Sequence, residues 1–346
     1  MRALLVAAAT ALVACGGVAT GPIRPASAVP YTAAPTPSAT PYNLDDMMGL
    51  YAQQTVFVAS TGKISAVTLL NHFVRYTIPT SGVVQAAADS PGQFLYVLDD
   101  AGLRTFDAAT GEVRATRSAV GAAASDHALA VAVDGRPLIL HADARHAWVD
   151  AYEYVTLEPK GTVMEKPGCG DRLLASGNRV VIVCLATGEI AIDALRGGGT
   201  TLVAGALPKL AGATITGDGA MYVVTADQQL GVVAPDTTKL TAMPWPSEWS
   251  GTVLPDAIAA GAGAPSVAIA ERSSDGAWLR IFQTNNLQQR LSVRLSDVPQ
   301  GGIVALYPFA YYGVGSTVRH VDMGSGLLET MTDVGAGARP LAVVNR

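Results

Sequence analysis

Short apolar triplets recur along the chain at nearly regular intervals. Their middle residues are separated by 39, 43, 43, 40, 46 and 43 positions, and they are Phe57, Tyr96, Ile139, Ile182, Tyr222, Ala268 and Tyr311. Each triplet is bounded by Gly, Asp or Asn, as expected of short strands between tight turns. A period near 42 lies within the ~40–50 residues of a propeller blade. The pattern therefore predicts a β-propeller of seven blades.

The residues around each triplet predict four strands per blade. Residues 92–119 contain three alternating segments joined by Asp-Asp-Ala-Gly and Ala-Ala-Thr-Gly, which supply the residues that hairpin turns need. A smaller segment rich in Ala, such as 84–88, precedes the triplet and suits the crowded centre of a ring. We expect four-stranded antiparallel blades in an all-β fold.

The repeat region lacks an inner strand at its start and has an extra one at its end. The first triplet, 56–58, has no convincing inner strand before it, whereas 341–344 reads as an inner strand with no outer strands after it. The C-terminal strand is therefore predicted to complete the first blade, which removes the two exposed sheet edges of an open ring.

The segment LYVLDDAGLRTFDAATGEV, 95–113, and its weaker copies resemble the YVTN and quinoprotein-like group of WD40-like β-propellers. The resemblance extends over residues 51–346 and implies the same seven-bladed architecture. It names no catalytic residue.

The first residues read as an export signal. Met1 and Arg2 give a short basic start, and residues 3–14 carry no charge. About 12 residues of helix span about 18 Å, too short for a bilayer core of ~30 Å. Leu12-Val13-Ala14-Cys15 resembles the lipobox of bacterial lipoproteins, which implies a signal peptide over 1–14 and a lipidated Cys15. The alternative is a secretory signal cut near Ala28, with Cys15 incidental.

Residues 15–43 are rich in Pro, Ala and Thr and show no apolar periodicity, so we expect a disordered tether between Cys15 and a propeller over 44–346. A short helical turn is expected at 43–52. This organisation predicts a protein of the cell envelope, lipid-anchored outside the cytoplasm on a periplasmic or cell-surface face. The formal net charge of -5 provides no basic field for nucleic acid.

Cys169 and Cys184 are the other two of the three cysteines. A hairpin about Gly177 and Asn178 places position 171 opposite 184, so Cys169 lies within reach of its partner. An oxidising compartment favours a disulfide. Two buried thiols, or a metal or redox role, remain the alternatives.

Few residues suggest catalytic or metal chemistry. His141, Asp143 and His146 share a probable turn and are weak candidates for a metal site. Asp residues recur near the predicted hairpins, where they favour turn capping, although propeller enzymes can collect such groups at a channel mouth. They are Asp99, Asp100, Asp107, Asp193, Asp227, Asp236 and Asp322. We predict no metal and no cofactor.

Aromatic residues in connecting segments suggest an interface. Trp245 and Trp249 lie in a Pro-rich connection, and Tyr307 and Tyr311 lie in a second aromatic cluster. Exposed Trp and Tyr anchor protein interfaces or sugar platforms. Packing between neighbouring blades is the alternative for both groups.

The function favoured by these features is a membrane-anchored scaffold that binds a protein partner in the envelope. The sequence does not decide whether the protein is an enzyme, and it favours a non-enzymatic role. One alternative is a lactonase-like hydrolase or lyase, which requires at least three Asp, Glu or His side chains at one channel mouth. Another is a carbohydrate or cell-wall binding module that uses Trp245 and Trp249.

Overall fold

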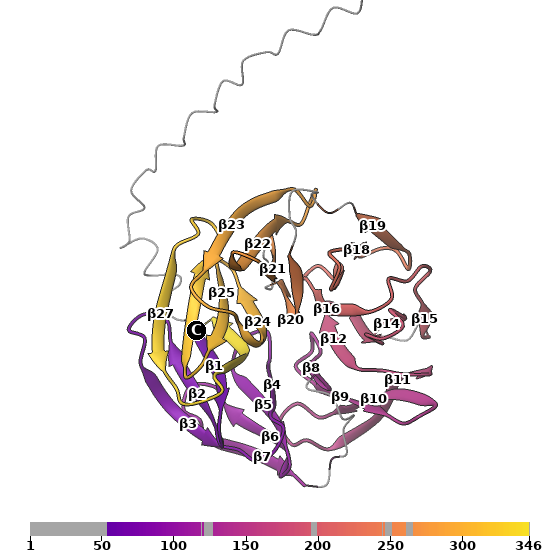
Figure 1. The fold of residues 1–346 in the computed structure, drawn as a ribbon. Coiled ribbons are helices and arrows are strands. Elements are labelled where there is room, and N and C mark those ends of the chain that lie inside the picture. The colour runs from indigo at the N-terminus through magenta and orange to yellow at the C-terminus, as the bar shows by residue number, and fades with distance from the viewer. Residues whose placement is uncertain are drawn as a thin grey trace, which may run out of the picture. The chain divides into compact units, whose positions relative to one another are not determined.

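The computed structural model describes residues 54–118, 120, 127–194, 199–243, 245, 251–260 and 266–345. Within these ranges the chain forms seven four-stranded antiparallel sheets arranged as the blades of a ring (Figure 1). The predicted all-β, seven-bladed propeller is confirmed. The described residues contain no helix long and apolar enough to cross a membrane.

The first three blades form the indigo to magenta part of the ring in Figure 1. Blade 1 comprises β28 (Arg339–Asn345), β1 (Gln54–Ser60), β2 (Lys63–Thr68) and β3 (Val74–Pro79). Blade 2 comprises β4 (Gln85–Ala88), β5 (Phe94–Asp99), β6 (Gly102–Asp107) and β7 (Val113–Arg117). Blade 3 comprises β8 (Leu129–Val131), β9 (Pro137–Ala142), β10 (His146–Tyr152) and β11 (Pro159–Pro167).

The other four blades follow in chain order. Blade 4 comprises β12 (Arg172–Ser176), β13 (Arg179–Val183), β14 (Ile190–Ala194) and β15 (Thr201–Leu202). Blade 5 comprises β16 (Leu210–Ile215), β17 (Met221–Thr225), β18 (Leu230–Val233) and β19 (Leu240–Met243). Blade 6 comprises β20 (Thr252–Ala260), β21 (Ser266–Ser273), β22 (Gly276–Gln283) and β23 (Gln289–Leu295). Blade 7 comprises β24 (Gln300–Leu306), β25 (Phe309–Val314), β26 (Thr317–Asp322) and β27 (Leu328–Asp333).

The apolar triplets form the second strand of every blade because that strand is covered on both faces. In β5, Leu95 and Val97 pack toward blade 1, whereas Tyr96 and Leu98 pack toward blade 3. Alternate side chains therefore enter two different inter-blade cores. This double burial explains why the triplets are continuously apolar and do not alternate with polar residues.

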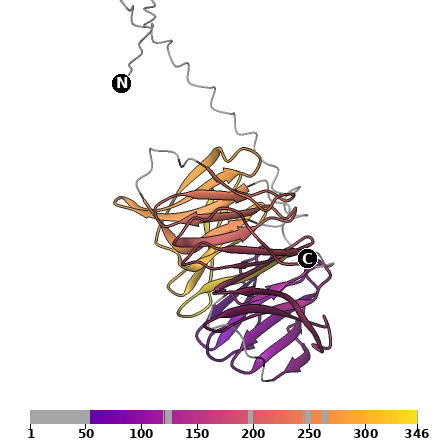
Figure 2. The same cartoon turned by 90° about the vertical axis from the view of Figure 1, so that its right-hand side faces the viewer.

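The ring closes as the two ends of the repeat region predict. β28 pairs antiparallel with β1 on its inner side, with Val343 opposite Val56. The buried Tyr311 hydroxyl of blade 7 donates to Gln54 Oε1 of β1 at 2.6 Å. The two ends of the described chain thus share one sheet, and blade 7 packs against it (Figures 1 and 2).

Candidate functional site

The inner strands bring a set of equivalent residues to one end of the central channel. These residues lie 10–12 positions before the middle of each triplet, or at the start of β28, and they are Gln85, His127, Arg172, Gly212, Asp256, Gly301 and Arg339. Because all seven inner strands run in the same direction, equivalent positions on them meet at the same mouth. All of these residues except Gly212 line a cavity of about 370 Å³.

Asp256 is the centre of the polar contacts in this mouth. The Arg172 guanidinium, which is buried, bonds to Asp256 Oδ1 and donates to the Ala213 carbonyl at 2.7 Å. His127 Nε2 donates to Asp256 Oδ2 at 3.1 Å. The backbone of Asp256 has a φ of 56°, a left-handed conformation that turns its side chain toward both partners.

Two glycines of β24 in blade 7 provide room for the longer side chains of the neighbouring blades. A Cβ at Gly301 would lie 2.4 Å from the Arg339 side chain, and one at Gly302 would lie 3.0 Å from the Asp256 carbonyl oxygen. Both glycines have positive φ, which other residues adopt with strain. The Arg339 guanidinium reaches across to the Val84 carbonyl at 2.6 Å, so it spans blades 1 and 2.

The charges at the mouth do not cancel. Burial and the nearby Arg172 lower the pKa of His127, so this imidazole is neutral at pH 7. Burial raises the pKa of Asp256, but the His127 hydrogen bond and the Arg172 charge outweigh it and keep the carboxylate ionised. Two guanidinium groups therefore face one carboxylate. The described residues that line the cavity carry one excess positive charge.

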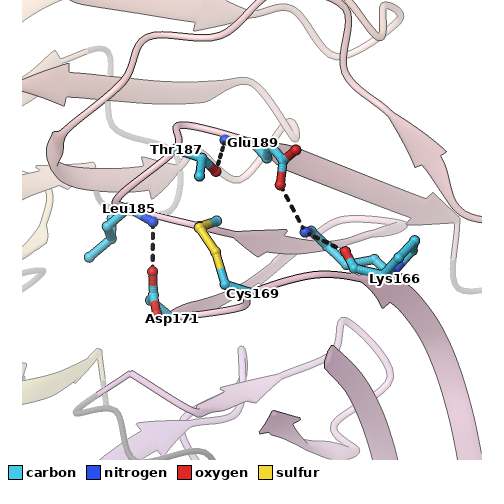
Figure 3. The surroundings of a disulfide bond; sticks show 8 residues. Lys166, Cys169, Asp171, Leu185, Thr187 and Glu189 are labelled. Carbon is cyan, nitrogen blue, oxygen red and sulfur yellow. Dashed lines mark hydrogen bonds and ion pairs between the residues drawn. A yellow bond between two sulfur atoms is a disulfide. The ribbon is translucent and has the colours of Figure 1, made fainter. Parts of the chain in front are cut away.

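The predicted disulfide is present between Cys169 and Cys184, with Cα atoms 5.6 Å apart (Figure 3). Arg172 pairs with Val183 in the β12–β13 hairpin, so position 171 lies opposite 184 as the sequence indicates. Asp171 beside it accepts the Leu185 N–H at 2.8 Å, and Lys166 faces Glu189 at 3.4 Å. These contacts make the region a structural link between blades 3 and 4.

The three weak metal candidates do not point at a common centre. Asp143 accepts the N–H groups of Arg145 and His146 and thereby caps the β9–β10 turn. His141 and His146 stack against the Trp148 ring, at centroid distances of 5.2 and 5.3 Å. His141 faces Asp150 and His146 faces Glu165, so the two imidazoles have different acidic partners.

The aromatic candidates separate into different environments. Trp245 is half-buried, with its ring 5.4 Å from that of Phe282. Tyr311 is fully buried, because a central strand has a neighbouring blade on each face. For Tyr311 this corrects the expectation of an interface anchor, and packing between blades is what the structure shows. Tyr307 is half-buried among blade 6 and blade 7 residues, and its carbonyl accepts from Gln54 at 3.2 Å.

Several predicted features fall on parts of the chain outside the described residues. They are Cys15 with the signal peptide, the 15–43 tether, the turn at 43–52, and Trp249.

None of the seven aspartates named from the sequence lines the channel cavity, and at least two of them cap turns. Asp107 Oδ1 accepts from Ala109 and Thr110, and Asp322 Oδ1 accepts from Gly324 and Ser325. The sequence did not single out His127, Arg172, Asp256 or Arg339 as channel residues. Aligning the repeats on their triplets would have placed His127, Arg172 and Asp256 within two positions of one another.

No family model matches the chain, and no curated protein matches its sequence. Solved structures share its fold. U3-55K is 15% identical, over 84% of this chain and 92% of that one, with a TM-score of 0.59. Apo AztD from Citrobacter koseri is 11% identical over 85% of this chain and 98% of that one, with a TM-score of 0.56. The WD40 repeats of RRP9 are 15% identical over 84% of this chain and 91% of that one, with a TM-score of 0.57.

Identities this low establish the fold alone. The chain is thus a seven-bladed β-propeller that shares its fold with the WD40 repeats of RRP9. Its function has to be argued from its own residues.

Proposed function

We propose that this propeller is a protein-binding scaffold, held outside the cytoplasm by a lipid on Cys15, whose channel mouth receives an acidic group of its partner. The observation that carries the proposal is that two arginines, Arg172 and Arg339, line the channel cavity with a single carboxylate, Asp256, to which Arg172 bonds. The lipobox-like Leu12–Cys15 segment and the 15–43 composition support the anchor and the tether.

A carboxylate is the ligand that this mouth complements. Guanidinium groups bind carboxylates through paired, charge-assisted hydrogen bonds, which strengthen where water is excluded. A cavity of about 370 Å³ accommodates a side chain or a chain end rather than a folded domain. The partner therefore presents an Asp or Glu side chain, or its C-terminal carboxylate, to the ring.

The enzyme alternative is less well supported. Among the described residues lining the cavity, two Asp, Glu or His side chains meet, His127 and Asp256, and not the three that the hydrolase interpretation requires. Asp256 also already bonds to Arg172. The carbohydrate alternative loses support at Trp245, whose ring packs against Phe282.

The test is recovery of a partner from solubilised membranes with the full chain as bait. We expect the native protein to recover a partner in an amount near that of the bait. The control Arg114→Gln, which changes an exposed arginine outside the channel, should recover the same amount. Arg339→Gln should lose the partner, and millimolar succinate should compete for it. Thermal unfolding of both variants checks that the ring is intact.

Two results would count against the proposal. Recovery of the native protein alone would reject the scaffold role. Equal recovery with Arg339→Gln would reject the channel as the binding site. The anchor is tested separately, because mass spectrometry of the membrane-extracted N-terminus should find acyl chains on Cys15 that Cys15→Ser lacks.

A further inference from the structure

Two histidines and a glutamate meet at the junction between blade 1 and blade 7. His72 lies in the turn between β2 and β3, His320 lies on β26, and Glu329 lies on β27. One ligand atom of each residue lies within 4.8 Å of the other two. We infer that this cluster, here called the seam site, binds a divalent transition-metal ion, with Zn²⁺ the best match.

The distances suit coordination after a small movement. His320 Nε2 lies 3.5 Å and His72 Nε2 lies 3.9 Å from Glu329 Oε2. Zn–N and Zn–O bonds of about 2.0–2.2 Å in a tetrahedron put neighbouring donors about 3.3–3.5 Å apart. Only His72 has to approach, and its place in a turn leaves it the most adjustable of the three donors.

The two donors on blade 7 are held in place by the sheet. His320 and Glu329 are directly opposite each other in the β26–β27 pairing. His320 is 4% exposed, and its ring packs edge-on against Phe309, with centroids 5.0 Å apart. Rigid elements of this kind fix ligand geometry better than loops do.

The buried imidazole of His320 lacks a good hydrogen bond at either nitrogen, which makes this side chain a candidate metal ligand. His320 Nδ1 is buried and has no hydrogen-bond partner. Its Nε2 faces Glu329 at 3.5 Å, beyond a good hydrogen bond. A metal ion on Nε2 would therefore give this nitrogen a bond that Glu329 does not supply in the hydrogen-bond sense, and the neutral ring would keep its proton on Nδ1.

The donor set selects the ion. Imidazole nitrogens suit Zn²⁺, Ni²⁺, Co²⁺ and Cu²⁺, whereas Ca²⁺ and Mg²⁺ require oxygen ligands. Two histidines and one glutamate leave a fourth position, as in zinc sites that also hold water. The His72 and Glu329 side chains are 31% and 44% exposed, so that position opens toward solvent.

Bound metal would tie the first blade of the chain to the last one. His72 belongs to the sheet that β28 completes, and the other two ligands belong to blade 7, which lies beside it (Figure 1). The ion would therefore reinforce the junction across which the ring closes. This role is independent of the channel mouth.

The test is calorimetric titration of ZnCl₂ into the full chain, purified without a polyhistidine tag and stripped with chelator. His72→Ala and Glu329→Gln are the test variants, since both positions are partly exposed. His146→Ala is the matched control, because His146 Nε2 lies 3.6 Å from Glu165 Oε2 and that pair has no second imidazole. Thermal unfolding with and without Zn²⁺ provides a second measurement.

We expect one equivalent of Zn²⁺ to bind the native protein and His146→Ala, and to raise the unfolding temperature of both. His72→Ala should weaken binding by at least about 100-fold, because loss of a ligand costs more than loss of an outer-shell partner. CaCl₂ should produce neither effect. Absence of Zn²⁺ binding, or undiminished binding by His72→Ala, would overturn the inference.

Discussion

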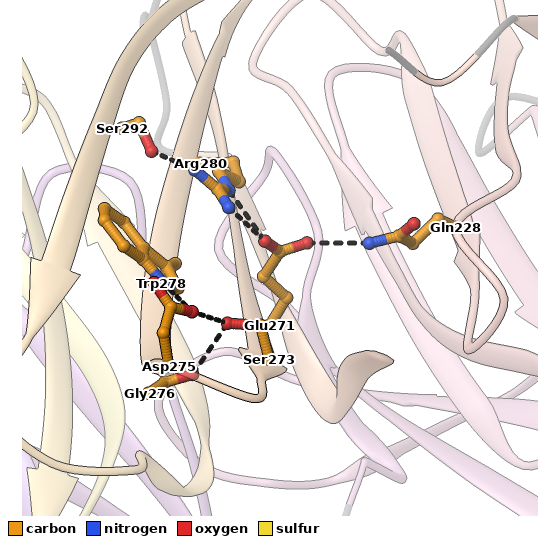
Figure 4. Close-up of polar contacts among 8 residues, drawn as sticks. All are labelled: Gln228, Glu271, Ser273, Asp275, Gly276, Trp278, Arg280 and Ser292. Carbon is orange, nitrogen blue, oxygen red and sulfur yellow. Dashed lines mark hydrogen bonds and ion pairs between the residues drawn. The ribbon is translucent and has the colours of Figure 1, made fainter. Parts of the chain in front are cut away.

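Replacing Arg280 by Met should strongly destabilise blade 6, because it strands a buried carboxylate. Glu271 on β21 is fully buried. Its Oε1 accepts from Arg280 Nε at 2.8 Å and from Nη2, and its Oε2 accepts from Gln228 of blade 5 at 2.9 Å (Figure 4). Arg280 also lies over the Trp278 ring, 4.8 Å from the centroid.

The expected size follows from what Arg280→Met leaves behind. Removing one partner of a buried ion pair costs about 3–5 kcal/mol, since the remaining charge stays in a low-dielectric site. The Gln228 bond persists and favours the lower end, about 3 kcal/mol. The double variant Glu271→Met/Arg280→Met buries no charge, so we expect it to cost less than about 1.5 kcal/mol.

The assay is urea unfolding followed by far-UV circular dichroism, with all variants compared at one pH. Arg114→Met is the control, because Arg114 and Asp107 form an exposed, solvent-screened pair that contributes little to stability. The reasoning is refuted if Arg280→Met costs no more than Arg114→Met. It is equally refuted if the double variant is as unstable as Arg280→Met.

Two further predictions concern the disulfide and acid stability. Cys169→Ser/Cys184→Ser should cost about 3 kcal/mol in urea unfolding, as expected for a closed loop of 15 residues. The native protein in reductant should lose the same amount, and an unchanged midpoint would contradict the prediction. Burial, with the nearby His72, lowers the pKa of His320 to about 4. An unfolded histidine titrates near 6.5, so between these values the unfolded chain binds more protons, and stability should fall by about 3 kcal/mol as pH drops from 6.5 to 4. Urea midpoints measured in chelator should show this slope in the native protein and a shallower one in His320→Leu; identical slopes would contradict the assignment.

The architecture was largely predictable because one strand in each blade is buried on both faces. That burial produces the triplets, and their spacing fixes the blade number. The inner strand β24 was not singled out in the sequence, since Gly301 and Gly302 interrupt its apolar pattern. These glycines serve the neighbouring Asp256 and Arg339, a requirement visible only once blades 6, 7 and 1 are side by side.

The candidate sites were harder to predict because ring closure assembles them. His72 and His320 lie far apart in the sequence and meet only where blade 7 packs against blade 1. Arg172 and Asp256 likewise come from different inner strands. The Cys169–Cys184 pair was predictable because a single hairpin sets its geometry, and local geometry can be inferred from turn residues.

The pairing of β28 with β1 sets an order of events during synthesis. Blades 2 to 7 are each built from one continuous stretch of chain and can form as that stretch emerges. Blade 1 contains the first described strand, β1, but its sheet is complete only after the last strand, β28, has paired with β1. Until then β1 presents an unpaired edge to other chains. A chain that stopped before Arg339 would lack the strand that covers this edge and would keep β1 exposed to other chains.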